Sequence, residues 1–406
     1  MDAEPRTSAP GLPRGLTSVL AVACGLIVAD LYYGQPLLPE LAASFRIPAG
    51  VAGLSVVFPQ LGYAIGLVFV VPLGDLRATR PLIVGLLVLN ATALLVAALA
   101  PAVWLLLAAL TAAGLAASAI SMIIVLATAL ARHDQAGAVV GKLMTGLLTG
   151  ILLARTIAGA VEEVAGWRAV YGGSAVLIAG LATVLHRRLP LHPTSATTTY
   201  LPLLGSIAGL IRREPFLRWR MALGLVAFAS IQLLWSALPL LLYAKPYEYS
   251  TGTIGLHGLL GAVGALMAHQ LGRLHDRGHT HRATGILLAL AATALALTTD
   301  GTHLIPLLVG VALCSAATQG IHILNQASLL TYTPAARSRA STAYMTASFF
   351  GGTVGGGLAA PIHSAGSWPA VVAAELAICA IGGLIWVISR RRGRTAAASK
   401  SIGSDP

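Results

Sequence analysis

Three ionisable side chains lie inside long apolar segments of the sequence: Asp30, Arg155 and Glu375. A charge in a membrane-spanning helix costs about 2.5–3.5 kcal/mol on insertion scales, so each of them requires a physical reason. An acid can take up and release a proton, and a neighbouring arginine can bias that exchange or bind an anionic group. These residue types therefore indicate proton or ion coupling.

Asp30 and Arg155 are predicted to lie at similar depth. Asp30 follows about fifteen residues of its apolar segment and Arg155 about eighteen of its own, so at 1.5 Å per residue their depths agree within about one helical turn. We predict that they pair, with Asp30 carrying the proton or cation. A static polar pair that orients two helices is the alternative. Glu375 either lines the mouth of a solute cavity or, more simply, extends its carboxylate to water.

Neutral polar side chains recur in the same apolar segments. A solute cavity is mostly apolar with a few directed polar groups, and such residues can supply them. Others will instead form hydrogen bonds between helices. Besides Glu375, the candidates for the cavity are Tyr32, Tyr33, Gln35, Gln60, Tyr63, Gln232, Trp235, Gln319, His322, Asn325 and Gln326.

Covalent and metal chemistry find little support in the sequence. The one adjacent acidic pair, Glu162 and Glu163, falls in a predicted loop with no base nearby, and the histidines near position 279 have no cysteine or carboxylate set beside them. The glycine run 351–357 lacks the lysine of a phosphate-binding loop. We predict no enzyme, no metal and no cofactor, so energy must come from a proton or solute gradient.

The composition indicates a membrane protein. Of 406 residues, 56% are hydrophobic and 10% are charged, against roughly 25% charged in soluble domains. The net charge of +12 does not indicate nucleic-acid binding, because the basic residues recur in short runs between apolar stretches. Lipid offers no partners for free backbone groups, so the apolar segments must be helices. We predict twelve, at 16–39, 50–72, 81–100, 102–129, 138–160, 169–185, 215–243, 253–271, 283–299, 303–330, 341–361 and 368–389.

The basic residues predict the orientation. With the N-terminus inside, 22 of the 26 Lys and Arg residues fall on the inner side, as the positive-inside rule requires. We predict a multi-pass protein of the plasma (inner) membrane with both termini cytoplasmic. The predicted parts are a tail (1–15), a six-helix bundle (16–186), a linker (187–214), a second six-helix bundle (215–389) and a basic tail (390–406).

The two predicted bundles repeat each other at a fixed offset. Asp75 and Asp276 each close a corresponding span, and Trp167 and Trp368 each begin one; both pairs are 201 positions apart. Two parallel six-helix halves are a transporter architecture, with the solute site between them near the membrane midplane.

The loop at 272–278, Gly-Arg-Leu-His-Asp-Arg-Gly, resembles the G-x-L-x-D-R-x-G loop of the major facilitator superfamily. The loop at 72–80 is a looser copy that keeps the Asp but lacks an Arg directly after it. Segments 29–39, 150–156 and 336–339 resemble the YnfM-like branch of drug:proton antiporter-type exporters. The resemblance implies a cytoplasmic gate built from Asp75, Arg77, Arg80, Gly272, Asp276 and Arg277, although ordinary loop charges explain the same residues.

We therefore expect an all-α secondary transporter, with proton-coupled export of a small amphipathic or drug-like solute by alternating access. Uptake or efflux of a sugar or another small metabolite is the alternative. A membrane-embedded enzyme and a non-transporting receptor on the same fold are the remaining classes. The expected partners are the lipid bilayer and a small solute, with no nucleic acid, and the expected state is a monomer.

Overall fold

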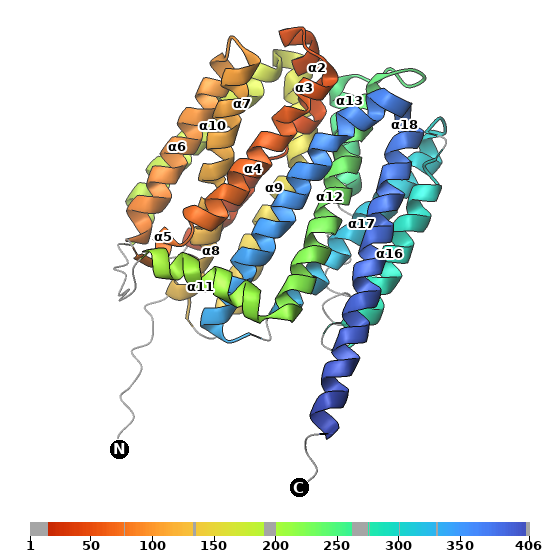
Figure 1. Cartoon of the computed structure of the whole chain (residues 1–406). Helices are drawn as coiled ribbons and strands as arrows, with labels where there is room; N and C mark the ends of the chain where they lie inside the picture. The colour runs from red at the N-terminus through yellow and green to blue at the C-terminus, as the bar shows by residue number, and fades with distance from the viewer. Residues whose placement is uncertain are drawn as a thin grey trace.

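The computed structural model describes residues 15–76, 78–132, 135–190, 200–261, 275, 277–299, 301–329 and 332–402. Every regular element in these ranges is a helix, and the long helices run roughly side by side (Figure 1). Within them, nine segments are long and apolar enough to cross a membrane. The prediction of an all-α fold is confirmed.

The first half of the chain follows the predicted segments closely, with two breaks. The first predicted span is divided by a turn from Asp30 to Tyr33, and the fourth is divided at Ser118. The helices are α1 (Leu16–Ala29), α2 (Gly34–Phe45), α3 (Ala49–Ala52), α4 (Leu54–Phe69), α5 (Leu73–Leu76), α6 (Thr79–Leu99), α7 (Val103–Ala117), α8 (Ala119–Leu130), α9 (Ala136–Ala165) and α10 (Trp167–Arg188).

The second half contains both the eleventh and the twelfth predicted spans, which share the label α18. Gly366 and Ser367 between them leave helical backbone angles, so α18 consists of two helices that meet at a kink. The eighth predicted span begins with two short helices, and its remainder lies outside the described residues. The elements are α11 (Tyr200–Arg213), α12 (Pro215–Tyr243), α13 (Thr251–Leu256), η1 (His257–Gly261), α16 (Thr280–Ala296), α17 (Leu304–Ser328) and α18 (Pro334–Ile402).

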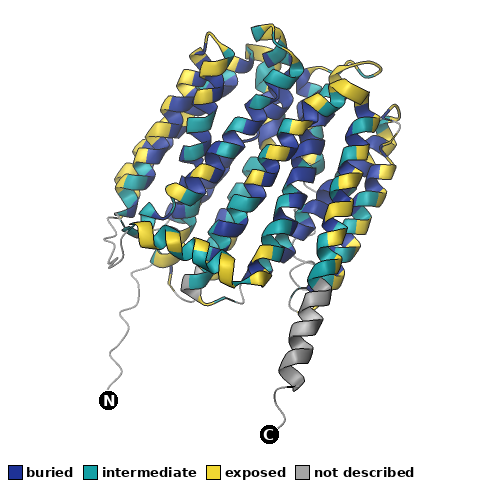
Figure 2. Ribbon diagram, in the orientation of Figure 1, coloured by how far each residue is buried: buried dark blue, intermediate teal, exposed yellow. Residues whose placement is uncertain are grey.

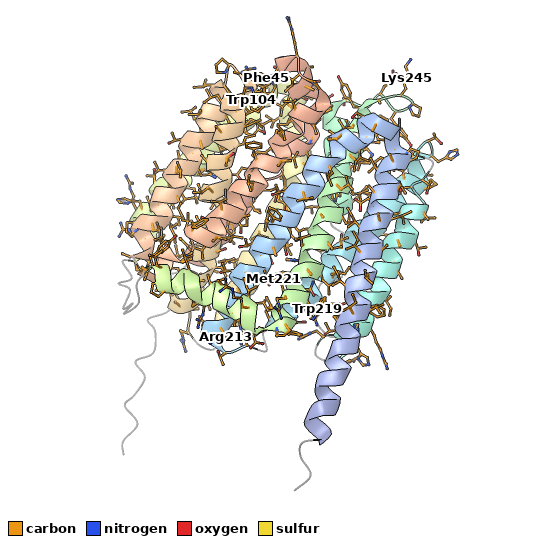
Figure 3. The ribbon with its side chains drawn as sticks, viewed as in Figure 1. Phe45, Trp104, Arg213, Trp219, Met221 and Lys245 are labelled. Atoms are coloured by element: carbon orange, nitrogen blue, oxygen red, sulfur yellow. The ribbon has the colours of Figure 1, made fainter. Side chains whose placement is uncertain are left out.

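The predicted linker contains a helix that the sequence analysis did not predict. α11 lies across one end of the long helices (Figure 1). Its residues Ile207, Leu210 and Ile211 pack on a small core of the second half, while the Tyr200 hydroxyl donates to the Phe69 carbonyl of the first half at 2.7 Å. We call this the α11 end. Figure 3 labels Arg213, Trp219 and Met221 there and Phe45, Trp104 and Lys245 at the opposite end, the Lys245 end.

Each half has its own hydrophobic core. The first core is built from residues 16–189 and, from the described part of the second half, buried Phe349. The second is built from residues between 227 and 379. Large apolar side chains are also exposed along the outer faces of the helices (Figure 2), as for Leu99, Val176 and Ile305 at 71%, 71% and 76%. Such extended apolar surface is what a lipid environment accommodates and water does not.

Glycine sets the separation of α1 and α9. A Cβ at Gly150 would overlap the backbone of Gly25, and one at Gly146 would overlap the carbonyl of Ala21. The two backbones therefore touch, as is usual where small residues line a helix interface in membranes. This contact fixes where α9 carries Arg155 relative to the turn that follows α1.

Gly150→Ala should lower the stability of the purified protein by about 1–3 kcal/mol, because the added methyl group forces two packed helices apart. Gly141→Ala is the matched control: it lies on the same helix with open space around it, so it should be neutral or up to about 1 kcal/mol stabilising. Thermal unfolding in detergent measures both. Equal melting temperatures for the two variants would contradict the close contact.

Candidate functional site

Arg155 on α9 lies where the two halves of the chain meet. Its guanidinium carbon is 5.0 Å from the ring centre of Tyr32 in the first half and 4.3 Å from that of Trp235 in the second. Its Nε donates to the side-chain carbonyl of Gln35. The residue is 7% exposed, and among the described residues it forms no salt bridge. Arg155 is therefore a buried cation held by aromatic faces and one amide.

Two further amides continue this cluster. Gln35 donates through Nε2 to Oε1 of Gln232 at 3.5 Å, which joins α2 to α12. Gln60 on α4 is close by: a Cβ at Gly352 would lie 3.1 Å from Cγ of Gln232 and 3.8 Å from Oε1 of Gln60. Within the described chain, Nε2 of Gln232 and both polar atoms of Gln60 are buried without partners. Unmet amide groups of this kind cost about 1–3 kcal/mol each, which makes them available to a solute.

Asp30 points away from this cluster, so the predicted pair with Arg155 is wrong. Asp30 caps α1 with helical backbone angles, and its carboxylate is buried in the first half, where Asn90 of α6 donates from Nδ2 to Oδ2 at 2.7 Å. Asn90 also donates to the carbonyl of Ala113 at 2.9 Å. The second carboxylate oxygen has no partner among the described residues. The prediction rested on the similar depth of Asp30 and Arg155 along their helices. In the structure, the partner of the Asp30 carboxylate is the neutral amide of Asn90 on α6, not the guanidinium of Arg155.

Glu375 does not extend to water, which corrects the simpler prediction. It is fully buried in the second half, and the Ser230 hydroxyl of α12 donates to its Oε2 at 2.6 Å. Its Oε1 has no partner in the described chain. The residue lies on the face of α18 that packs against α12, so its side chain cannot reach the surface. Among the described side chains, each half thus encloses one fully buried carboxylate that a neutral group holds.

The repeat shows how these two acids are related. At the offset of 201, Glu375 corresponds to Ser174, and Asp30 corresponds to the position after Ser230. Ser174 of α10 lies 3.4 Å from the Tyr33 hydroxyl. The first and last spans of each half therefore meet through polar groups in both halves, but the acid is on the first span in one half and on the last span in the other.

The other cavity candidates divide between the halves and their interface. Tyr63 contacts Phe349 across the interface in a tilted arrangement, with ring centres 4.4 Å apart. Tyr33 is bonded inside the first half. In the second half His322 bonds the Tyr344 hydroxyl at 2.9 Å, Asn325 accepts from Arg220 at 3.1 Å, Gln326 donates to the Met345 sulfur at 3.7 Å and Gln319 is half-buried.

Most of the predicted gate lies outside the described residues. The structure does not describe Arg77, Gly272, Asp276 or the side chain of Asp75. Arg80 donates from Nη2 to the His186 carbonyl, which joins α6 to α10 within the first half. Arg277 lies in the turn before α16. The gating role of these residues stays a prediction.

At the Lys245 end the two halves are in direct contact. The Thr156 hydroxyl donates to the Gly255 carbonyl at 3.0 Å, and a Cβ at Gly159 would lie 3.1 Å from the Gly255 Cα. The Glu162–Glu163 pair, expected in a loop, instead forms part of the last turns of α9, and the Glu163 carboxylate lies against Gly252. One end of the interface is thus closed by backbone and small side chains.

Sequence reasoning missed the neutral partners of both acids, Asn90 and Ser230, and the ring of Phe349. Asn90 carried a usable signal, since a lone amide in an apolar span meets the criterion that selected Gln60. Ser230 and Phe349 carried none, because serine and phenylalanine are ordinary in membrane helices.

Comparison with known proteins gives consistent matches. The family model described as Major Facilitator Superfamily matches residues 20–303. The uncharacterized transporter YgaY of Escherichia coli O157:H7 is 39% identical over 376 residues, which are 92% of this chain and 95% of the relative. The Streptomyces coelicolor protein named "Probable transporter SCO4007" is 33% identical over 374 residues, 91% of this chain and 84% of the relative. A bacterial homologue of the human lysosomal transporter Spinster, inward-facing and occupied, superimposes with TM-score 0.73 at 14% identity and covers 93% of this chain and 96% of its own.

Asn90→Ala should destabilise the protein by about 1–3 kcal/mol, because it leaves a buried carboxylate oxygen without its donor. The cost of Asp30→Ala should be smaller in the Asn90→Ala background than alone, since the two residues share one interaction. Thr92→Ala is the control on the same helix: its exposed hydroxyl bonds only the carbonyl of Val88, so its effect should stay within about 0.5 kcal/mol. Thermal unfolding in detergent provides the four-variant cycle, and additive costs would contradict the bond.

Proposed function

Because the chain belongs to the Major Facilitator Superfamily and is a multi-pass membrane transporter, we propose that it exports a small amphipathic solute in exchange for protons. The two halves would alternate around a central site that faces one side of the membrane at a time. The buried carboxylate of Asp30, held by a neutral amide and by no cation of the described chain, is the observation that carries the coupling. The proposed direction rests on the resemblance of three segments to exporters.

The Arg155 cluster supports a solute site between the halves. Its residues come from α2 and α9 on one side and from α12 on the other, so its contacts must change whenever the halves move apart. The closed Lys245 end supports the view that this arrangement is one of two alternating states. In members with this architecture, rigid-body rocking of one half against the other exposes the site to each side in turn.

Asp30 can couple proton movement to that rocking. A charged carboxylate in an apolar core is costly, and neutralising it by protonation removes that cost. Protonation also turns an oxygen that accepts from Asn90 into a potential donor, which changes the bond between the turn after α1 and α6. The proton would therefore alter the packing of the first half beside the turn that carries Tyr32 and the start of α2, which carries Gln35.

The orientation follows from charge. The α11 end carries the basic residues of the linker, such as Arg212 and Arg213. We place it in the cytoplasm, with both chain termini on that side of an inner (plasma) membrane, because basic loops are retained there. The Lys245 end then faces outward, and the described arrangement is closed toward the outside.

Asp30→Asn should abolish pH-driven solute movement, because an amide cannot take up the exchanged proton. Liposomes containing the purified protein, with an acidic interior, are offered two permanently charged fluorescent arenes, naphthalene-2-sulfonate and ethidium. The wild-type protein should accumulate at least one of them while the gradient lasts, and Asp30→Asn should show only equilibration.

Glu248→Gln is the control for that experiment, since it removes an exposed loop carboxylate and should leave accumulation unchanged. Solute exchange without a pH gradient should persist in Asp30→Asn, which separates lost coupling from lost folding. Accumulation by the wild-type protein that is the same with and without the gradient would overturn proton coupling.

A further inference from the structure

Arg155 is a buried positive charge that no described carboxylate neutralises. From this we infer that the solute is an organic anion with a flat aromatic or similarly apolar body, and that Arg155 binds its charged group. This substrate class deepens the function proposed above and rests on it. The argument uses three layers of side chains between the halves: Arg155 itself, the unpartnered amides and a group of aromatic rings.

The charge of Arg155 has capacity left for a ligand. A guanidinium has five N–H donors in a planar fork, and only Nε–H has an acceptor among the described residues, Oε1 of Gln35. The rings of Tyr32 and Trp235 stabilise the cation through their faces but accept no ordinary hydrogen bond. A carboxylate or sulfonate accepts two parallel N–H bonds from such a fork and cancels the charge. An anionic ligand therefore supplies what the protein leaves unmet.

The two amides next to Arg155 form the second layer. Gln232 lies three residues before Trp235 on α12, and Gln60 on α4 approaches it from the first half. Their three unpartnered polar atoms are buried, and buried polar groups in native proteins are nearly always bonded. A ligand with polar atoms on its edge, or a water carried with it, would satisfy them.

Aromatic rings form the third layer, one helical turn further toward the α11 end. Phe228 precedes Gln232 by four residues on α12, Phe349 precedes Gly352 by three on α18, and Tyr63 follows Gln60 by three on α4. Phe349 lies 4.4 Å from Tyr63 and 5.1 Å from Phe228, measured between ring centres. Rings from both halves thus meet at one level, and they must part when the halves separate.

The spacing of the layers sets the size of the solute. Trp235 and Phe228 are seven residues apart on one face of α12, which corresponds to about 10 Å along the helix axis. A two-ring arene with one acidic group spans this distance: the acid reaches Arg155 and the rings meet Phe228, Phe349 and Tyr63. The remote carboxylates do not change this reading, since Asp30 and Glu375 are bonded inside their own halves.

Charge also distinguishes this reading from other substrate classes. A cationic solute would face an unneutralised arginine, and like charges held together in a desolvated site are strongly disfavoured. A neutral sugar could use the amides and the rings, but it would leave the guanidinium without a counter-charge. An organic anion satisfies all three layers.

The test is ligand-induced thermal stabilisation of the purified protein by three naphthalene derivatives that differ in head group. They are the anion naphthalene-2-sulfonate, the neutral 2-naphthalenemethanol and the cation 2-naphthylmethyl-trimethylammonium. The charge state of each is independent of pH in the working range. A ligand that binds the folded state raises its melting temperature. The sulfonate should stabilise the wild-type protein, and at equal concentration the alcohol should do so more weakly and the ammonium not at all.

Variants at Arg155 then locate the effect. Arg155→Gln should weaken sulfonate binding at least tenfold, and Arg155→Lys, which keeps the charge without the planar fork, should weaken it less and preserve the preference for the anion. Arg168→Gln is the matched control, because Arg168 also stacks on a tryptophan, Trp167, but is exposed; it should bind as the wild type does. If Arg155→Gln does not fold, Arg155→Lys still reports the preference.

Three results would overturn the assignment: no stabilisation of the wild-type protein by the sulfonate, stabilisation by the ammonium equal to or above that by the sulfonate, or undiminished sulfonate binding in the folded Arg155 variants. The measurement contains no pH gradient. If the sulfonate does not bind as expected, proton coupling through Asp30 is still decided by the liposome experiment. If the liposome experiment shows no proton coupling, the preference for an anion is still decided by the binding measurement.

Discussion

A positive charge surrounded by apolar helices must be stabilised by something, and in this protein the stabilising groups come from both halves of the chain. Arg155 is carried by α9, yet its guanidinium lies over the ring of Trp235 of α12 as well as over that of Tyr32. The charge therefore links the two bodies at the level where a solute must pass. Its energy depends on their relative position, because separating the halves removes part of what makes burial of the cation tolerable.

The carboxylates follow a different rule. Asp30 and Glu375 each lie in the core of one half with a neutral donor, Asn90 or Ser230, so their energies depend on packing within that half. These charges thus differ in location: the Arg155 cation lies between the two halves, and the Asp30 and Glu375 carboxylates each lie within one half. A neutral donor holds a carboxylate less firmly than a cation would, which leaves its protonation state open to change without the loss of a salt bridge.

Apolar segment length and the distribution of basic residues were enough to predict the fold, since lipid admits few alternatives to a helix. The boundaries of α12 were predicted to the residue, and those of α4 and α6 within a few. Side-chain direction was less accessible. Depth along a helix follows from counting, so Asp30 and Arg155 were placed at one level. The direction of the side chain does not follow from counting: Asp30 keeps helical backbone angles at the end of α1, and its carboxylate meets Asn90 of α6. The burial of Glu375 was missed for the same reason: position along α18 was known, but the face it presents to α12 was not.

The helix α11 has a mechanical consequence for any motion at its end of the molecule. Its first residue, Tyr200, is bonded to the backbone of α4, and its later turns pack on the second half through Ile207 and Leu210. A single stiff rod of 14 residues is therefore fastened to both bodies. Separation of the two halves at this end therefore stretches the Tyr200 bond or pulls α11 off the second half, so opening here must break one of these two attachments.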